Sequence, residues 1–410
     1  MNNIFLNQVG FVPKGTKRAV LNFDQKEFEI RDLTGKCVFT GKVKHFGTDD
    51  ISGENTFIAD FSELKEDGSY RVYAKDVSSA AFTVSENVYD KLMRDICKCF
   101  YYLRCGDVLT KEYAGEYYHE PCHMTKATVY GEDVPAVDVS GGWHDAGDYG
   151  RYSTAGAVAV AHILYGVRFF PKLLKTEFDI PKEKCQKGNL PDILSEVKVE
   201  LDFLMKMQRE DGSVWHKVTT FNHAPFVMPQ EDKNELFLFP VSSMATADVA
   251  AVFALASSIY KDYDSKYADK LMLRAKKACE WLEDNPGPLL FKNAEGSNTG
   301  EYGENEDISN RFWAAASMYE VTGDKTFYEE LLQLEDRLCI FDEEDKQKGY
   351  QGDVFTCFGW AQVAGLGCLS LILKGDGDEL SVSVQNRFVK EADRLVASAK
   401  KNGFNLCMEE

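Results

Sequence analysis

The chain has 410 residues and a mass of 46.2 kDa, more than one ordinary domain usually holds, so we expect two or three folding units. It carries 66 acidic and 47 basic residues, and the net charge of −19 argues against nucleic acid or a membrane surface as a partner. Hydrophobic residues make up 44% of the chain, enough for a large core and too many for a disordered protein. The composition therefore predicts an acidic globular protein.

The N-terminus has neither a basic start nor an apolar run of signal-peptide length, and no stretch approaches the ~18–20 apolar residues of a membrane helix. We therefore expect a cytoplasmic protein, or a secreted one if a leader has been removed. The 11 cysteines are odd in number and scattered along the chain. This pattern favours reduced thiols, some of them on a metal, over a disulfide framework.

Short strand-like runs separated by Gly and Asp turns fill the first part of the chain. They lie at residues 19–23, 28–30, 37–40, 56–59, 70–73 and 81–84. Short strands at such regular spacing are typical of an all-β sandwich of immunoglobulin size. Because the Cys…Trp…Cys core of antibody domains is absent from this part, we predict an immunoglobulin-like β-sandwich domain over residues 1–84 without that hallmark.

After this region the hydrophobic period becomes that of helices. Apolar stripes predict helices near residues 88–104, 151–168, 191–208, 243–260, 265–284, 308–321, 325–335, 354–372 and 383–400. Pro191-Asp192 and Asp353 are typical helix starts, and Gly323-Asp324 predicts a break between two helices. The long loops 106–150 and 209–242 are unusual unless they carry function. We predict an all-helical domain over residues 85–410.

The segment Asp138–Gly150 reads DVSGGWHDAGDYG and is the densest cluster of chemically active residues. Its glycines favour a tight loop before a helix, and Asp145 and Asp148 are close enough in sequence to hold one water between them. Paired carboxylates activate water for attack on the anomeric carbon of a sugar. The alternative is a structural role, in which an Asx turn and a helix N-cap satisfy backbone donors.

A second cluster combines Cys105, Cys122, His123 and His144 within 40 residues. Two thiolates and two imidazoles suit a tetrahedral zinc ion, although the spacing is not that of a zinc finger. Buried free cysteines are the alternative.

The chain resembles glycoside hydrolase family nine, the cellulase family, in its branch with an N-terminal immunoglobulin-like domain. The resemblance is strongest in the segment Asp138–Tyr149 and extends over nearly the whole chain. The other matching segments are residues 7–11, 17–20, 190–194, 207–208, 240–248, 311–316, 359–360 and 363–367. The resemblance implies an (α/α)6 barrel that hydrolyses β-1,4-glucans with inversion, with Asp148 as general base and Asp145 positioning the water.

Inversion also needs a general acid, which in the family is a glutamate near the C-terminal end of the barrel. We find no counterpart of that segment here, and nine predicted helices are fewer than six hairpins require. We therefore expect the barrel to be incomplete and the acid to lie outside this chain. The terminal Glu409 and Glu410 are not assigned as the acid, because chain ends are most often solvated.

The resemblance also implies a zinc site. Zinc-bearing members of the branch carry a similar set of residues, namely a Cys, a Cys-His pair and a His-Asp pair. With four protein ligands and no open position, such a zinc would be structural. Thr299, Glu301 and Asp307 offer oxygens suited to calcium, but the family's Asp-Glu pair is Ser309-Asn310 here. A solvated acidic loop is the alternative.

Trp143, His216 and Trp360 are predicted to contact the substrate, because the resemblance places sugar-contacting residues at His216 and Trp360 and because aromatic faces stack on sugars. Trp313 is interpreted as packing. Two alternatives to a cellulase-like endoglucanase stay open. One is an exo-acting glycosidase on cello- or glucosamine oligosaccharides, and the other is a glycan-binding protein without catalytic activity.

Overall fold

The structure is a computed structural model that describes residues 3–338, 354–356 and 358–407. The described chain forms two compact units. The first comprises residues 1–96 together with 389–410, and the second comprises residues 97–388. The predicted boundary between residues 84 and 85 lies inside the first unit, and the domain limits stay a prediction.

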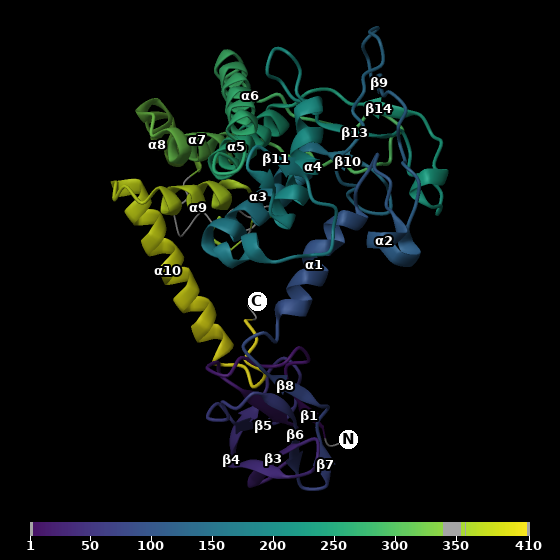
Figure 1. Cartoon of the computed structure of the whole chain (residues 1–410). Helices are drawn as coiled ribbons and strands as arrows, with labels where there is room; N and C mark the ends of the chain where they lie inside the picture. The colour runs from purple at the N-terminus through teal and green to yellow at the C-terminus, as the bar shows by residue number, and fades with distance from the viewer. Residues whose placement is uncertain (1–2, 339–353, 357, 408–410) are drawn as a thin grey trace. The chain divides into compact units, whose positions relative to one another are not determined.

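The first unit is built on an eight-stranded sheet with the order β1-β2-β5-β4-β3-β6-β7, in which β8 also pairs with β6 (Figure 1). The strands are β1 (Ile4–Phe5), β2 (Arg18–Leu21), β3 (Glu27–Asp32), β4 (Cys37–Thr48), β5 (Asn55–Asp60), β6 (Gly68–Ala74), β7 (Val77–Ser78) and β8 (Phe82–Val84). The long strand β4 pairs with β3 through its first half and with β5 through its second half, where the register shifts between His45 and Gly47. The strand changes partner between Lys42 and Val43, so one strand serves both layers of a sandwich.

Alternation along the strands places one set of side chains in the core of the sandwich. In β6 the buried residues are Tyr70, Val72 and Ala74, and the residues between them are more exposed. Each predicted strand run contains an observed strand, which confirms the β-sandwich. Two strands of only two residues, β1 and β7, were not predicted, because such short pairings leave no periodic pattern in the sequence.

The far end of the chain packs on this sandwich. The ring of Phe404 meets that of Phe5 edge-on at 5.6 Å. The backbone N–H of Gly403 donates to Oδ2 of the buried Asp49 at 3.0 Å. Residues nearly 400 apart in sequence therefore share one compact unit, a contact that no local pattern predicts.

The second unit is dominated by helices (Figure 1). The helices of the described chain are α1 (Asp90–Tyr102), α2 (Lys111–Ala114), α3 (Ser153–Phe169), α4 (Asp192–Met207), α5 (Ser243–Tyr260), α6 (Ser265–Asp284), α7 (Ile308–Thr322), α8 (Lys325–Leu338), α9 (Ala364–Lys374) and α10 (Glu379–Ala399), of which α1 begins and α10 ends in the first unit. Helix α5 packs against α3, α6 and α7. By length and composition α5 is also apolar enough to cross a membrane, but 94% of it is buried inside the protein, as a central core helix is.

Most predicted helices lie within a few residues of the observed ones. The predicted helix 354–372 differs, because α9 begins only at Ala364, where the side chain of Gln362 accepts the backbone N–H of Ala364 at 3.2 Å. Before it, Phe355 is buried in a turn, so its apolar character reflects packing and not a helix. The predicted helix start at Asp353 lies outside the described residues. The predicted break is confirmed, since Gly323 ends α7 in a left-handed conformation with φ 69°.

The two long loops pair with each other through short strands. These strands are β9 (Thr128–Val129), β10 (Arg151–Tyr152), β13 (Lys217–Thr220) and β14 (Leu236–Leu238), in the order β10-β13-β14-β9. A separate hairpin joins β11 (Lys184–Cys185) and β12 (Gly188–Asn189). The small sheet, which the sequence did not predict, holds the segment Asp138–Gly150 at its β10 edge.

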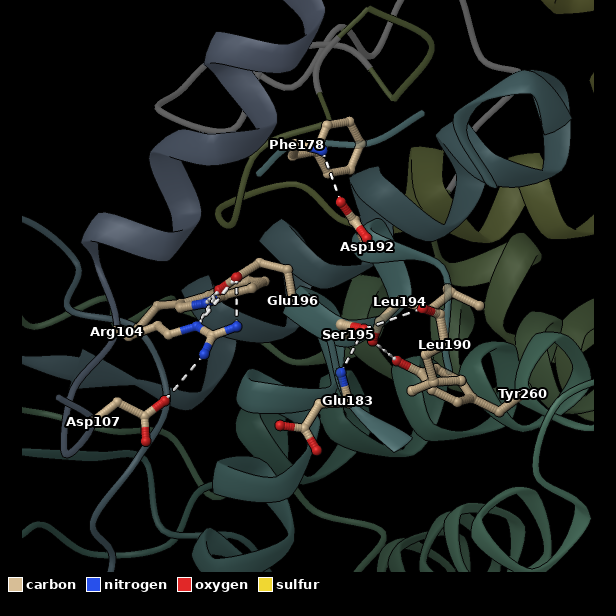
Figure 2. A network of polar contacts seen from close by, with 11 residues as sticks. Arg104, Asp107, Phe178, Glu183, Leu190, Asp192, Leu194, Ser195, Glu196 and Tyr260 are labelled. Atoms are coloured by element: carbon tan, nitrogen blue, oxygen red, sulfur yellow. Dashed lines mark hydrogen bonds and ion pairs between the residues drawn. The ribbon is translucent and has the colours of Figure 1, made fainter. Parts of the chain in front are cut away.

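Helix α4 is tied to the loops around it by buried polar contacts (Figure 2). Arg104 lies between Glu196 of α4, at 2.8 Å, and Asp107, at 3.2 Å. Asp192 at the start of α4 accepts the backbone N–H of Phe178 at 2.8 Å, and Ser195 accepts that of Glu183 at 3.1 Å. These contacts fix the face of α4 that supports the candidate site.

Candidate active site and metal site

The segment Asp138–Gly150 is held in place by backbone geometry and by Arg151. Gly142 has a φ of 80°, and a side chain there would lie 2.6 Å from the ring of Phe203 and 2.9 Å from Oε2 of Glu200, so only glycine fits. The buried guanidinium of Arg151 donates to the carbonyls of Val139, at 2.6 Å, and Gly141, at 2.9 Å. These contacts hold the backbone of residues 139–142, at the start of the segment.

Each of the two predicted catalytic aspartates is held by one tyrosine. Oδ2 of Asp145 accepts the hydroxyl of Tyr302 at 2.8 Å, and Oδ2 of Asp148 accepts the hydroxyl of Tyr152 at 2.6 Å. Oδ1 of Asp148 is buried and has no hydrogen-bond partner among the described residues. Desolvation by the surrounding protein, together with the charge of Asp148, raises the pKa of Asp145, and the Tyr302 hydroxyl opposes this. The Asp148 carboxylate is thus held at one oxygen and has no hydrogen-bond partner at the other among the described residues.

Backbone strain concentrates around these residues. In the described chain, six residues other than glycine have a left-handed φ, and three of them are His123, Tyr149 and Tyr302, at 51°, 56° and 49°. Such conformations are costly for ordinary side chains and collect at functional sites. This backbone strain indicates, independently of the sequence motif, that the region is a functional site.

An aromatic row lies beside the two carboxylates. The ring of Tyr302 lies 4.5 Å from that of Tyr152 and 4.9 Å from that of Trp360. Tyr302 and Tyr152 contact the carboxylates directly, and Trp360 is linked to them through Tyr302. Trp360 is partly exposed, as a sugar-stacking residue must be. Tyr302 was not predicted, because it lies in a glycine-rich acidic segment whose oxygen atoms suggested only a calcium site.

The other two predicted sugar contacts are buried. Trp143 is 6% exposed, and its indole N–H donates to Glu196 at 2.9 Å. His216 has no exposed surface, its ring nitrogens lie 2.8 Å from Ser242 Oγ and 2.9 Å from the carbonyl of Glu301, and desolvation lowers its pKa to about 3. The geometry gives Trp143 and His216 packing roles. Their contact with a sugar stays a prediction that this geometry does not support.

The predicted metal ligands come together. One ligand atom from each of Cys105, Cys122, His123 and His144 lies within 4.8 Å of the others, and all four residues are buried. Sγ of Cys122 is 3.7 Å from Nε2 of His144, close to the edge of a tetrahedron with metal bonds of about 2.0–2.3 Å. A contact with Cys105, the largest of several causes, lowers the pKa of the Cys122 thiol to about 7, which favours the thiolate that binds metal. This cluster could hold a metal ion.

His123 supplies the strongest test of that fit. Its Nε2 lies 3.2 Å from Oδ2 of Asp232, and both side chains are almost fully buried. Its Nδ1 is buried without a hydrogen-bond partner among the described residues. A histidine whose one nitrogen is oriented by a carboxylate and whose other nitrogen is free has the arrangement of a metal ligand. Asp232 was not predicted, because it lies 109 residues from His123 in sequence.

The predicted calcium ligands already have protein partners. The hydroxyl of Thr299 accepts from Lys217 at 2.9 Å, the Glu301 carboxylate accepts the backbone N–H of Asn293 at 2.9 Å, and Asp307 pairs with Arg311 at 2.8 Å. A calcium ion would compete with each of these contacts. Calcium binding by Thr299, Glu301 and Asp307 stays a prediction.

Comparison with known proteins places this geometry in a family. Residues 89–408 match glycosyl hydrolase family 9, and residues 1–79 match the cellulase N-terminal Ig-like domain. The fold and the site thus define a glycoside hydrolase. The chain belongs to glycosyl hydrolase family 9, in the group with an N-terminal Ig-like domain, and the predicted fold class is confirmed.

Individual relatives agree over the whole chain. A cellodextrinase of Butyrivibrio fibrisolvens is 65% identical over 410 residues, which are 100% of this chain and 75% of the relative. Endoglucanase D of Acetivibrio thermocellus is 34% identical over 98% of this chain, which spans 63% of that relative.

Solved structures of the family superpose well. AaCel9A in complex with a cellobiose-like isofagomine gives a TM-score of 0.87 at 30% identity, over 99% of this chain and 74% of that one. A Zn-binding triple mutant of the family 9 endoglucanase J30 gives 0.86 at 30% identity, over 97% of this chain and 74% of that one.

Proposed function

We propose that the protein hydrolyses β-1,4-glucosidic bonds of cello-oligosaccharides and related glucans with inversion. In this proposal Asp148 is the general base and Asp145 positions the attacking water. The observation that carries it is the pair of carboxylates in one loop, each held through one oxygen by a tyrosine hydroxyl. A base needs a fixed position, and the hydrogen bond from Tyr152 gives the Asp148 carboxylate one.

Inversion supplies the stereochemical part of the proposal. The base removes a proton from water on one face of the sugar while an acid protonates the leaving oxygen, with the two carboxyl groups roughly 6.5–9.5 Å apart. We assign that acid to none of the described residues.

Cello-oligosaccharides are proposed as the substrate because the relative with 65% identity over the whole chain is named a cellodextrinase. The partly exposed Trp360 and its neighbour Tyr302 supply aromatic faces of the kind that stack on glucose rings. A product profile on cellotetraose and cellohexaose separates attack within the chain from attack at one end.

We also propose a structural zinc ion bound by Cys105, Cys122, His123 and His144. Four protein ligands leave no position for a catalytic water, so the metal would act by bracing the loop that follows His144. The geometry of the four ligand atoms supports this role. Metal analysis of the purified protein, with Cys105→Ser and Cys122→Ser combined, tests it, and full zinc occupancy in the double variant would contradict it. The cytoplasmic location is likewise a proposal, which cell fractionation tests.

The function is tested by replacing Asp148 with asparagine, which keeps the shape of the side chain but cannot accept the proton. We expect kcat on cellotetraose to fall by about a thousandfold or more, with binding largely kept, because the base acts only in the transition state. The control is Asp138→Asn, since Asp138 is an exposed aspartate of the same loop. It accepts the backbone N–H and the hydroxyl of Ser140, at 2.9 and 2.7 Å, and lies 3.8 Å from Nζ of Lys206. Equal activity of Asp148→Asn and the native protein would rule out Asp148 as base.

A further inference from the structure

Tyr152, which no sequence motif singles out, has a hydroxyl with a single arrangement of hydrogen bonds. Its oxygen accepts the backbone N–H of Gly300 at 3.1 Å and lies 2.6 Å from Oδ2 of Asp148. Because the Gly300 N–H can only donate, the one hydroxyl proton is left for the carboxylate. Desolvation and the hydrogen bond to Asp148 raise the pKa of Tyr152, so this hydroxyl stays protonated. The direction of the hydrogen bond to Asp148 is therefore fixed.

The partner of that hydroxyl is itself fixed by a buried lysine. Nζ of Lys217 donates to Oδ1 of Asn293 at 2.7 Å, to the hydroxyl of Thr299 at 2.9 Å and to the carbonyl of Gly300 at 2.7 Å. Three donors meet three acceptors, and Lys217 has no exposed surface. Lys217 thus anchors the segment whose Gly300 N–H reaches Tyr152.

Close packing leaves the hydroxyl no alternative position. A side chain at Gly150 would lie 2.6 Å from the Tyr152 oxygen and 2.8 Å from Oδ2 of Asp148. The ring of Tyr152 is fully packed, with 2% exposed surface, and lies 5.7 Å from the ammonium group of Lys217. The packing around Tyr152 therefore restricts its side chain to the rotamer in which the hydroxyl donates to Asp148.

We propose that Tyr152, anchored by Gly300 and Lys217, is a positioning residue for Asp148. It donates its hydroxyl proton to Oδ2 and so fixes the orientation of the Asp148 carboxylate, whose Oδ1 is buried without a hydrogen-bond partner among the described residues. Tyr152 does not itself take part in proton transfer. This inference rests on the proposed role of Asp148 as base.

The test compares Tyr152→Phe with Tyr165→Phe in the full-length protein. Tyr165 is a buried tyrosine of α3 whose hydroxyl donates to the carbonyl of Leu366 at 2.7 Å and accepts the indole N–H of Trp313 at 3.2 Å, so its replacement also removes buried hydrogen bonds. We expect Tyr152→Phe to lower kcat on cellotetraose about 10- to 100-fold with KM within about twofold, because a misplaced reacting group costs rate and not binding. Tyr165→Phe should lower the melting temperature but leave kcat within about twofold.

A double-variant cycle with Asp148→Asn separates the inference from the proposed function. If Tyr152 acts only through Asp148, adding Tyr152→Phe to Asp148→Asn should not lower the residual rate further. An inactive Asp148→Asn with an unchanged kcat for Tyr152→Phe would overturn the positioning role alone. A native rate for Asp148→Asn would overturn the function on which it rests. Gly150→Ala gives a second check, since its added methyl group should separate the two oxygens and lower kcat as Tyr152→Phe does.

Discussion

Nε2 of His123 lies 3.2 Å from Oδ2 of Asp232, and the two side chains are almost completely buried together. The contact leaves Nδ1 of His123 without a hydrogen-bond partner among the described residues, and His123 lies in a cluster with the two cysteines and His144 that could hold a metal ion. An aspartate that orients a ligand in this way controls how well the site binds metal.

Replacement of Asp232 by asparagine should therefore weaken zinc binding about 10- to 100-fold. The reason is that the imidazole of His123 loses the carboxylate that orients it and strengthens it as a ligand. Competition with a chromophoric chelator measures the affinity. Asp262→Asn, at an exposed aspartate, is the matched control and should bind zinc as the native protein does. An unchanged affinity in Asp232→Asn would show that His123 is not a ligand.

Trp360→Ala tests the aromatic row beside the carboxylates. Trp360 is partly exposed and lies 4.9 Å from Tyr302, so we expect it to stack on a glucose ring. Loss of the indole should raise KM for cellotetraose about tenfold, which corresponds to about 1.4 kcal/mol of binding free energy. Steady-state kinetics provide the measurement. Trp281→Ala, at a half-buried tryptophan of α6, should leave KM unchanged, and an equal rise in both variants would mean that Trp360 acts only through packing.

Glu304 should make the folded protein less stable as the pH rises. Desolvation, with smaller contributions from Glu306 and Asp307, raises its pKa from 4.5 to about 8, and a hydrogen bond from Asn310 opposes this. The folded state then holds a proton that the unfolded state releases, so the stabilisation is complete below about pH 4.5 and is lost as the pH rises through about 8. Glu304→Gln has no proton to lose, and its melting temperature should fall less between pH 5 and pH 8. Exposed Glu295→Gln is the control, and the same pH dependence in Glu304→Gln would exclude this residue as the source.

The buried ion pair between Arg104 and Glu196 should be costly to break from one side. The side chains are 5% and 1% exposed, and Glu196 also accepts the indole N–H of Trp143 at 2.9 Å. Arg104→Met leaves an uncompensated buried carboxylate, so the free energy of unfolding should fall by about 3–5 kcal/mol in urea denaturation. Adding Glu196→Gln removes the charge but keeps an acceptor for Trp143, and should recover part of the loss. A double variant less stable than Arg104→Met would contradict this account.

The parts of the site that could be predicted are those whose residues lie close together in sequence. Asp145 and Asp148 share one glycine-rich segment, and the metal ligands fall within 40 residues. Their partners Tyr302 and Asp232 lie 157 and 109 residues away from the groups they hold. No period or spacing links such pairs, so they could not be predicted.

Burial is the second quantity that the sequence left open. Trp143 and Trp360 are both tryptophans beside a loop, yet Trp143 is 6% exposed and donates to a buried glutamate while Trp360 is partly open to solvent. The same residue type is therefore a packing element in one place and a candidate sugar contact in the other. The choice depends on what the neighbouring helices leave uncovered.

The sequence by itself determined the order of a β-sandwich and a helical domain, because strand and helix periods are local properties of the chain. It also determined the family, through the contiguous segment Asp138–Tyr149 and the match over residues 89–408. Only the tertiary structure decided which oxygen of Asp148 is held and which is free, because that depends on Tyr152, Gly300 and Lys217 meeting at one point. Hydrogen bonds act over about 3 Å, and folding alone brings such distant residues within that reach.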